Sequence, residues 1–462
     1  MTTPRPPFQF TLDLPMPGRG EAPRPLAREV EVATATSEPE SPAPTANLME
    51  AICDPENIEA ALRAVVRNKG APGVDGITVR QLPGILKARW PEIEHHLLQG
   101  RYQPQPVRRV MIPKPWGGGE RALGIPTVID RVIQQAVLQR LQPLWDPTFS
   151  EHSYGFRPGR SAQQAVAQAQ AYVADGYQFV VDIDLAKFFD RVNHDILMGL
   201  VAKRVADKRI LTLIRGFLTA GVLADGLVGA TEEGTPQGGP LSPLLSNLTL
   251  DVLDKELETR GLNFVRYADD CNIYVCSQRA GERVMASIER FLTGRLKLRV
   301  NKAKSAVARP GKRKFLGFSF TSGTQPRRRI ASQSLARFRS RVRELTRRTR
   351  GKSLAQIVKE LSVYLTGWRG YFDFCETPSM LRDLDQWTRR RLRAIAWKQW
   401  KRGTTRFAEL RRRGVGRDLA AQTAGSPHGP WRLSNSPALT IALPNAFLAL
   451  LGLTSLVANK AA

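Results

Sequence analysis

The sequence predicts an α+β protein in which antiparallel strands with tight turns are followed by a helical region rich in arginine. Three observations indicate this fold class. Apolar and β-branched residues flank a short acidic step within residues 264–275, a pattern typical of a hairpin. Apolar residues alternate with acidic ones over 179–184, which predicts another strand ending in carboxylates. Beyond Pro326, arginines and aromatic residues interleave on segments that are expected to be helical.

Composition restricts the class of partner. The 462-residue chain carries 69 Lys and Arg against 42 Asp and Glu, a formal net charge of +27. We expect a polyanionic partner, and nucleic acid rather than a membrane, because no signal peptide and no uninterrupted apolar run of about 18 residues occurs. The four cysteines form no CxxC pair, which argues against a zinc ribbon or a disulfide framework and fits a reducing cytosol.

The N-terminal part divides into a leader and the start of a globular region. Residues 1–48 hold ten of the 32 prolines and no periodic apolar pattern, which predicts a disordered leader. Asp54, Pro55 and Glu56 predict the capped start of a helix that runs through Val66. A Gly- and Pro-rich loop is expected at 68–76.

Further elements follow in order. Two short strands with a glycine-rich turn are predicted at 108–126, where the turn would bring Lys114 and Arg121 together. A helix is expected over 127–144. The turn at 154–161 is basic and aromatic, and it is suited to contact a phosphate backbone through Arg157. The Gly/Pro-rich segment 234–243 predicts a rigid turn before a helix at 244–257, and another amphipathic helix is expected at 282–292.

The acidic residues predict the chemistry. Asp269 and Asp270 lie side by side in the predicted hairpin turn, and adjacent carboxylates raise each other's pKa unless a cation lies between them. A lone Asp-Asp pair is more often an ordinary polar turn. A third carboxylate comes from Asp184, or from Asp182 on the same strand face. Carboxylate clusters that hold two metal ions are a standard arrangement for nucleotidyl transfer.

Seven motifs in order resemble the reverse transcriptases encoded by bacterial group II introns of the compact type without an endonuclease domain. Tyr267-Ala268-Asp269-Asp270 resembles their Y-A-D-D box, and Asp184 with an aromatic five residues later resembles their first catalytic motif, which favours Asp184 over Asp182. The other matching segments are 68–76, 108–126, 154–158 (Y-G-F-R-P), 234–243 (P-Q-G) and 315–318 (primer grip). The helical segments 361–374 and 387–400 resemble the thumb and maturase domain.

The resemblance implies a right-hand polymerase with fingers and palm at 52–320, a helical thumb and maturase region at 321–453 and a tail at 454–462. The palm should be a small antiparallel sheet with helices on one face. Catalysis would rest on Asp184, Asp269 and Asp270, which together with Leu185 would bind two Mg²⁺. The implied nucleotide-binding residues are Lys114, Arg121, Phe189, Gln237 and Lys304. Phe189 is expected to exclude ribonucleotides, and Phe188 to lie in the core.

Arginines supply the expected nucleic-acid contacts, because a cationic run without balancing acids has phosphate as its natural counter-ion. The aromatic residues of this region are expected mainly in the core. The predicted nucleic-acid-binding residues are Arg157, Arg327, Arg328, Arg329, Arg369, Arg390 and Arg391.

The implied function is RNA-directed DNA synthesis from deoxynucleoside triphosphates by a protein that also binds intron RNA and assists its splicing and its mobility into a DNA target. Such a protein would act in the bacterial cytosol, near the nucleoid. Two alternatives stay open: a splicing maturase with secondary polymerase activity, and a related reverse transcriptase adopted for phage defence. No endonuclease module is expected after Leu453, since its paired cysteines are absent.

Overall fold

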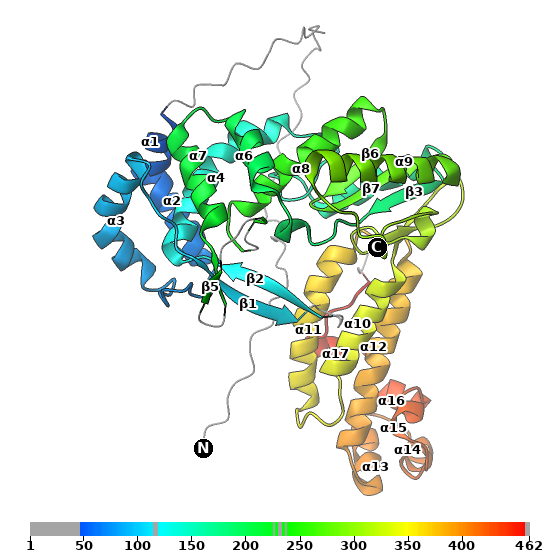
Figure 1. The fold of residues 1–462 in the computed structure, drawn as a ribbon. Helices are drawn as coiled ribbons and strands as arrows, with labels where there is room; N and C mark the ends of the chain where they lie inside the picture. Colours follow the sequence, from blue (N-terminus) through cyan, green and yellow to red (C-terminus); the bar gives the residue numbers. More distant parts are fainter. Residues whose placement is uncertain (1–46, 114–118, 225–226, 230–232, 236–237, 458–462) are drawn as a thin grey trace, which may run out of the picture. The chain divides into compact units, whose positions relative to one another are not determined.

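The structure is a computed structural model that describes residues 47–113, 119–224, 227–229, 233–235 and 238–457 (Figure 1). These residues form α-helices together with mixed and antiparallel sheets, which confirms the predicted fold class. The predicted leader falls almost entirely outside the described residues. At its end, helix α1 (Leu48–Cys53) already begins at Leu48, whose side chain is buried.

Helices form the first part of the fold. The predicted helix is α2 (Pro55–Arg67), and the Asp54 carboxylate caps it by accepting hydrogen bonds from the backbone N–H groups of Glu56 (2.9 Å) and Asn57 (3.2 Å). Helix α3 (Leu82–Leu98) follows, and the predicted helix after the first hairpin is α4 (Val128–Trp145), capped by Thr127. Buried apolar side chains of these helices belong to one core.

A mixed sheet contains the first predicted hairpin. Strand β1 (Val107–Pro113) pairs antiparallel with β2 (Glu120–Ile125), so that Ile112 lies opposite Arg121. On its other side β1 pairs in parallel with β4 (Val222–Ala224), which pairs with β5 (Leu227–Gly229). Lys114 and Gln237, two of the predicted nucleotide-binding residues, lie outside the described residues.

The central sheet is antiparallel throughout, as predicted. Its order is β6 (Asn263–Tyr267), β7 (Asp270–Val275), β3 (Phe179–Ile183) and β8 (Ala306–Ala308). Val181 packs beside helix α9 (Gln278–Phe291), where it lies next to Gly281, whereas Val180 shares a cluster with helix α5 (Ala162–Ala174). The prediction of helices on one face is therefore wrong: β3 is apolar on both sides, so each face must be covered.

Three further helices complete this region. They are α6 (His194–Ala202), α7 (Lys208–Thr219) and α8 (Ser242–Thr259), and α8 is the helix predicted after the Gly/Pro-rich turn. Buried leucines of α8 join the same core as the helices of the first part.

A small sheet and a run of helices form the C-terminal region, and the helices confirm the prediction that this region is mainly helical. Strands β9 (Phe318–Phe320) and β10 (Arg328–Ile330) pair antiparallel. Helices α10 (Ser332–Leu345), α11 (Leu354–Phe372) and α12 (Pro378–Gln399) lie side by side around a shared core (Figure 1). The shorter helices are α13 (Gly403–Arg412), α14 (Arg417–Ala424), α15 (Pro430–Leu433), α16 (Pro437–Ala442) and α17 (Asn445–Leu450). Within the described part of the chain, no helix has both the length and the hydrophobicity that crossing a membrane requires.

Candidate active site

The acidic hairpin closes on a two-residue turn. Tyr267 pairs with Asp270, which leaves Ala268 and Asp269 as the turn, and Ala268 has a left-handed φ of 56°. On the neighbouring strand Ile183 pairs with Cys271, so the chain places Asp184, one residue further, level with Asp270. Two segments more than eighty residues apart thus bring three carboxylates to one edge of the sheet.

The 154–158 motif packs against the backbone of this turn. A Cβ atom on Gly155 would lie 2.3 Å from the backbone nitrogen of Ala268 and 3.0 Å from the carbonyl carbon of Tyr267. The Tyr154 N–H donates to the Arg266 carbonyl oxygen (2.9 Å). The position therefore requires glycine, and the motif supports the acidic turn from behind.

Arg266 braces the same turn from inside the protein. Its side chain is fully buried and donates to both carboxylate oxygens of Asp254 (2.7 and 2.5 Å), to Asn247 Oδ1 (3.1 Å), to Ser153 Oγ (2.8 Å) and to the Ala268 carbonyl oxygen (2.9 Å). Sequence reasoning missed this residue. Its signal is a charged residue inside an apolar strand, which is buried only when paired.

The neighbouring carboxylates disfavour one another's charge. Burial first, and then the charge of Asp184, raises the pKa of Asp269, while Arg121 and Lys304 oppose the rise. Desolvation by the surrounding protein, followed by the charges of Asp269 and Asp182, raises the pKa of Asp270 to about 7, although part of its side chain remains exposed. A cation between such neighbouring carboxylates would favour their charged forms.

Asp182 and Asp184 have different partners. Arg313 donates to Asp182 Oδ2 through Nε (2.8 Å) and forms an ion pair with it, so this acid already has a counter-charge. Among the described residues, the Asp184 carboxylate pairs with the Lys304 ammonium, at 3.3 Å from Oδ2, on a side chain that is 66% exposed. The structure thus favours Asp184 over Asp182 as an available ligand. Arg313 is a second residue that sequence reasoning missed.

The donor set suits a hard divalent cation. In the described ranges, no three His, Cys, Asp or Glu side chains are grouped closely enough to hold a metal ion as they stand. Carboxylate oxygens are nevertheless the ligands that Mg²⁺ prefers, and the Lys304 ammonium beside Asp184 shows that this edge accepts positive charge. Leu185, the remaining predicted ligand, directly follows Asp184 and bridges to Val300.

Two of the predicted nucleotide-binding residues that the structure describes, Arg121 and Lys304, lie near the acids. Arg121, on β2, is exposed, and its charge acts on Asp269. Phe188 is buried and Phe189 is half-buried, with their rings 5.2 Å apart. The two rings do not lie on a strand. They belong to a 3₁₀ turn over Phe188–Asp190, because the strand ends at Ile183.

Arg157 is not available to nucleic acid, contrary to the prediction. Its side chain is 3% exposed. Nε donates to Asp146 Oδ1 (2.9 Å), Nη1 to the carbonyl oxygens of Ser150 and Ser153, and Nη2 to the carbonyl and carboxylate oxygens of Asp146. This network holds the 154–158 motif in place, so Arg157 stabilises the fold.

The predicted arginine triplet separates into three environments. Arg327 is exposed. Arg328 lies over the Phe374 ring (3.8 Å), pairs with Glu376 (2.9 Å) and is mostly buried, so the predicted RNA contact is wrong for this residue. Arg329 is half-buried and donates to Ser319 Oγ (3.1 Å) and the Gly311 carbonyl oxygen (3.0 Å).

The remaining predicted arginines have polar contacts but no carboxylate partner in the part of the chain that the structure describes. Arg369 donates to the Ser455 carbonyl oxygen (3.1 Å). Arg390 lies over the Trp431 ring at 4.1 Å. Arg391 donates to Thr346 Oγ1 (2.6 Å), and burial followed by the charges of nearby arginines lowers its pKa.

Two parts of the chain match known protein families. Residues 112–320 match the family described as reverse transcriptase (RNA-dependent DNA polymerase), and residues 335–414 match the group II intron maturase-specific domain.

Among similar proteins, protein YkfC of Escherichia coli is 35% identical over 300 residues, which cover 56% of this chain and 78% of YkfC. Group II intron-encoded protein LtrA of Lactococcus lactis is 38% identical over 201 residues, which cover 44% of this chain and 33% of LtrA. The putative COX1/OXI3 intron 1 protein of Saccharomyces cerevisiae is 30% identical over 206 residues, 44% of this chain and 24% of that protein. The chain therefore belongs to the group II intron type of reverse transcriptases, RNA-dependent DNA polymerases with a maturase-specific domain.

Proposed function

We propose that the protein extends a DNA primer along an RNA template, using deoxynucleoside triphosphates and the carboxylates of Asp184, Asp269 and Asp270. The observation that carries this proposal is the strand register that puts Asp184 level with the acidic hairpin turn. The three acids and Leu185 would hold two Mg²⁺. When bound, such ions activate the primer 3′-hydroxyl and stabilise the leaving pyrophosphate.

The chain's own residues would orient the nucleotide. Arg121 and Lys304 are exposed cations beside the acids and would contact the triphosphate, with Lys304 moving from Asp184 to phosphate oxygens. Phe189 would pack against the sugar. Lys114 and Gln237 keep their predicted roles in nucleotide binding on sequence grounds alone.

The RNA partner would be a group II intron, which the protein binds, helps to splice and carries into a DNA target. Support comes from the maturase-specific match over 335–414 and from exposed arginines in that region that lack acidic partners among the described residues.

Primer extension on an RNA template tests the proposed active site. We expect Asp269→Ala to abolish extension and to leave RNA affinity within about twofold, because the acids serve the chemistry and not backbone binding. The matched control is Asp175→Ala, which removes an exposed carboxylate at the end of α5. Extension by purified Asp269→Ala protein at the parental rate would disprove the assignment. Loss of extension in the control would show a general effect of removing charge.

A further inference from the structure

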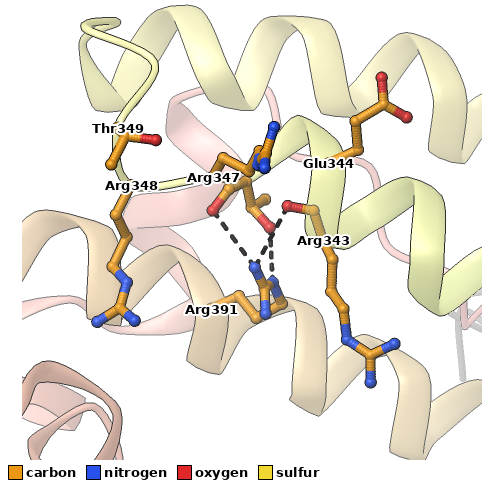
Figure 2. A pocket seen from close by; sticks show the side chains of 7 residues that line it. Arg343, Glu344, Arg347, Arg348, Thr349 and Arg391 are labelled. Atoms are coloured by element: carbon orange, nitrogen blue, oxygen red, sulfur yellow. Dashed lines mark hydrogen bonds between the residues drawn. The ribbon is translucent and has the colours of Figure 1, made fainter.

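A hollow lined by arginines lies where α10 ends against the middle of α12 (Figure 2). Two adjoining cavities form it, with volumes of about 500 and 290 Å³. Sites for small ligands commonly enclose about 300–1,000 Å³. Arg343, Thr346, Arg348 and Arg391 line both cavities, and we call this space the arginine hollow.

The centre of the arginine hollow is held in place. Nε of Arg391 donates to Thr346 Oγ1 (2.6 Å), and Nη2 donates to the carbonyl oxygens of Arg343 and Thr346 (both 3.4 Å). In Figure 2 the side chains of Arg343 and Arg348 extend on either side of this guanidinium. A fixed central arginine between two movable ones is suited to an anion with several oxygens.

The positive charges of the arginine hollow are not neutralised by any carboxylate that the structure describes. Arg343, Arg348 and Arg391 form no ion pair with a carboxylate of the described residues, although all three lie close together. Glu344, at the rim, forms an ion pair with Arg341 (2.6 Å), and its side chain points away from Arg391 in Figure 2. Clustered positive charges repel one another and destabilise the folded protein unless an anion binds among them.

Aromatic rings adjoin the same cavity. The guanidinium groups of Arg343 and Arg391 lie 5.7 and 5.3 Å from the centre of the Trp387 ring, so arginine already contacts this tryptophan. Trp431 also has an arginine over its ring, Arg390 at 4.1 Å, but its side chain is 39% exposed and lines the smaller cavity. Exposed tryptophan beside unpaired arginines suits a ligand that has both phosphate and a flat ring.

We propose that the arginine hollow binds one unpaired nucleotide of the RNA partner, with its phosphate among Arg343, Arg348 and Arg391 and its base against Trp431. The inference rests on the proposed RNA-binding function and adds to it the state of the RNA: a nucleotide that is unstacked. A paired duplex cannot present its bases to Trp431.

RNA affinity for two probes tests this inference. One probe is an RNA hairpin with a single bulged nucleotide, and the other is the same hairpin fully paired. The test variant is Arg343→Ala/Arg348→Ala, whose two lost side chains are exposed and make no hydrogen bond within the described ranges, so folding should persist. We expect it to lose about tenfold in affinity for the bulged probe, with a slope of log K against log salt that is shallower by about 0.7 to 0.9 per lost phosphate contact. Affinity for the paired probe should stay within about twofold.

Two further variants complete the experiment. Trp431→Ala should weaken binding of the bulged probe only. Arg382→Ala is the matched control, because it removes an exposed arginine of α12 that lies nine residues before Arg391 and so on the opposite helix face; it should change neither affinity.

Each other outcome is decisive. Equal losses of affinity for both probes, or no loss for either, would overturn the inference. If the parental protein still binds RNA and extends primers, such a result leaves the proposed function intact. A parental protein that bound neither probe would contradict the proposed RNA partner itself. Tight binding of free AMP that the double variant loses, with unchanged RNA affinity, would reassign the hollow to free nucleotides and overturn the proposal.

Discussion

Arginine has at least three roles in this chain, and the surroundings of each residue decide which one applies. Arg266 is fully buried against Asp254, Arg157 is buried in a network of carbonyl and carboxylate oxygens, and Arg327 is exposed. Each side chain carries the same charge. Burial makes the first two residues structural, because a desolvated guanidinium must have all its donors satisfied.

Removing the buried arginine should be costly. We expect Arg266→Met to lower the free energy of unfolding by about 3–5 kcal/mol, because it leaves the Asp254 carboxylate buried without a partner. Urea unfolding followed by circular dichroism measures this loss, with Arg327→Met as the exposed control. A loss below about 1 kcal/mol would show that Asp254 finds another partner or a proton.

The half-buried ring of Phe189 is the residue that we expect to select the sugar. Phe189→Val should raise ribonucleotide incorporation relative to deoxynucleotides by at least about tenfold in kcat/KM, some 1.4 kcal/mol, because the smaller side chain leaves room for a 2′-hydroxyl. Matched titrations of dNTP and rNTP in primer extension give this ratio. Unchanged discrimination would return Phe189 to a packing role beside Phe188.

At the scale of elements, the active-site edge depends on contacts between segments that are distant in sequence. Strand β7 contributes Asp270, the end of β3 contributes Asp184, and the turn at Gly155 sets the position of Ala268. The 154–158 motif, which the sequence suggested as a phosphate contact, thus acts as a support for the hairpin.

A methyl group at the support should disturb catalysis. We expect Gly155→Ala to reduce the rate of primer extension by about a hundredfold, since the added Cβ would lie 2.3 Å from the Ala268 nitrogen and must displace the turn that carries Asp269. RNA affinity should be retained. The control is Gly199→Ala in α6, where nothing lies within 4 Å of an added Cβ. Parental rates in Gly155→Ala would mean that the turn tolerates the shift.

For the molecule as a whole, the net charge of +27 is the dominant electrostatic property. It contrasts with the local cluster of acids at the sheet edge. An excess of positive charge attracts a polyanion at long range and with strong dependence on salt, whereas specific placement needs exposed side chains.

The arginine triplet offers a direct test of this distinction. Arg327→Ala should make the slope of log K against log salt shallower by about 0.7 to 0.9 for RNA, without loss of stability, since one exposed phosphate contact is removed. Arg328→Ala should leave the slope unchanged and destabilise the fold, because Glu376 and Phe374 lose their partner. Salt-titrated filter binding and thermal unfolding of both variants separate the two effects; identical slopes in Arg327→Ala and the parent would place Arg327 away from the RNA.

The sequence by itself determined the class of fold, most element positions and the acidic residues of the site, because strand alternation, caps and turn residues are local signals. It also predicted which of two neighbouring phenylalanines is buried. Only the tertiary structure decided that helices cover both faces of the sheet, that Asp182 is paired with Arg313, and that Arg157 and Arg328 are structural. Burial and ion pairing depend on residues that lie far apart along the chain. The sequence therefore does not show whether a charged side chain pairs with a carboxylate or is exposed to water.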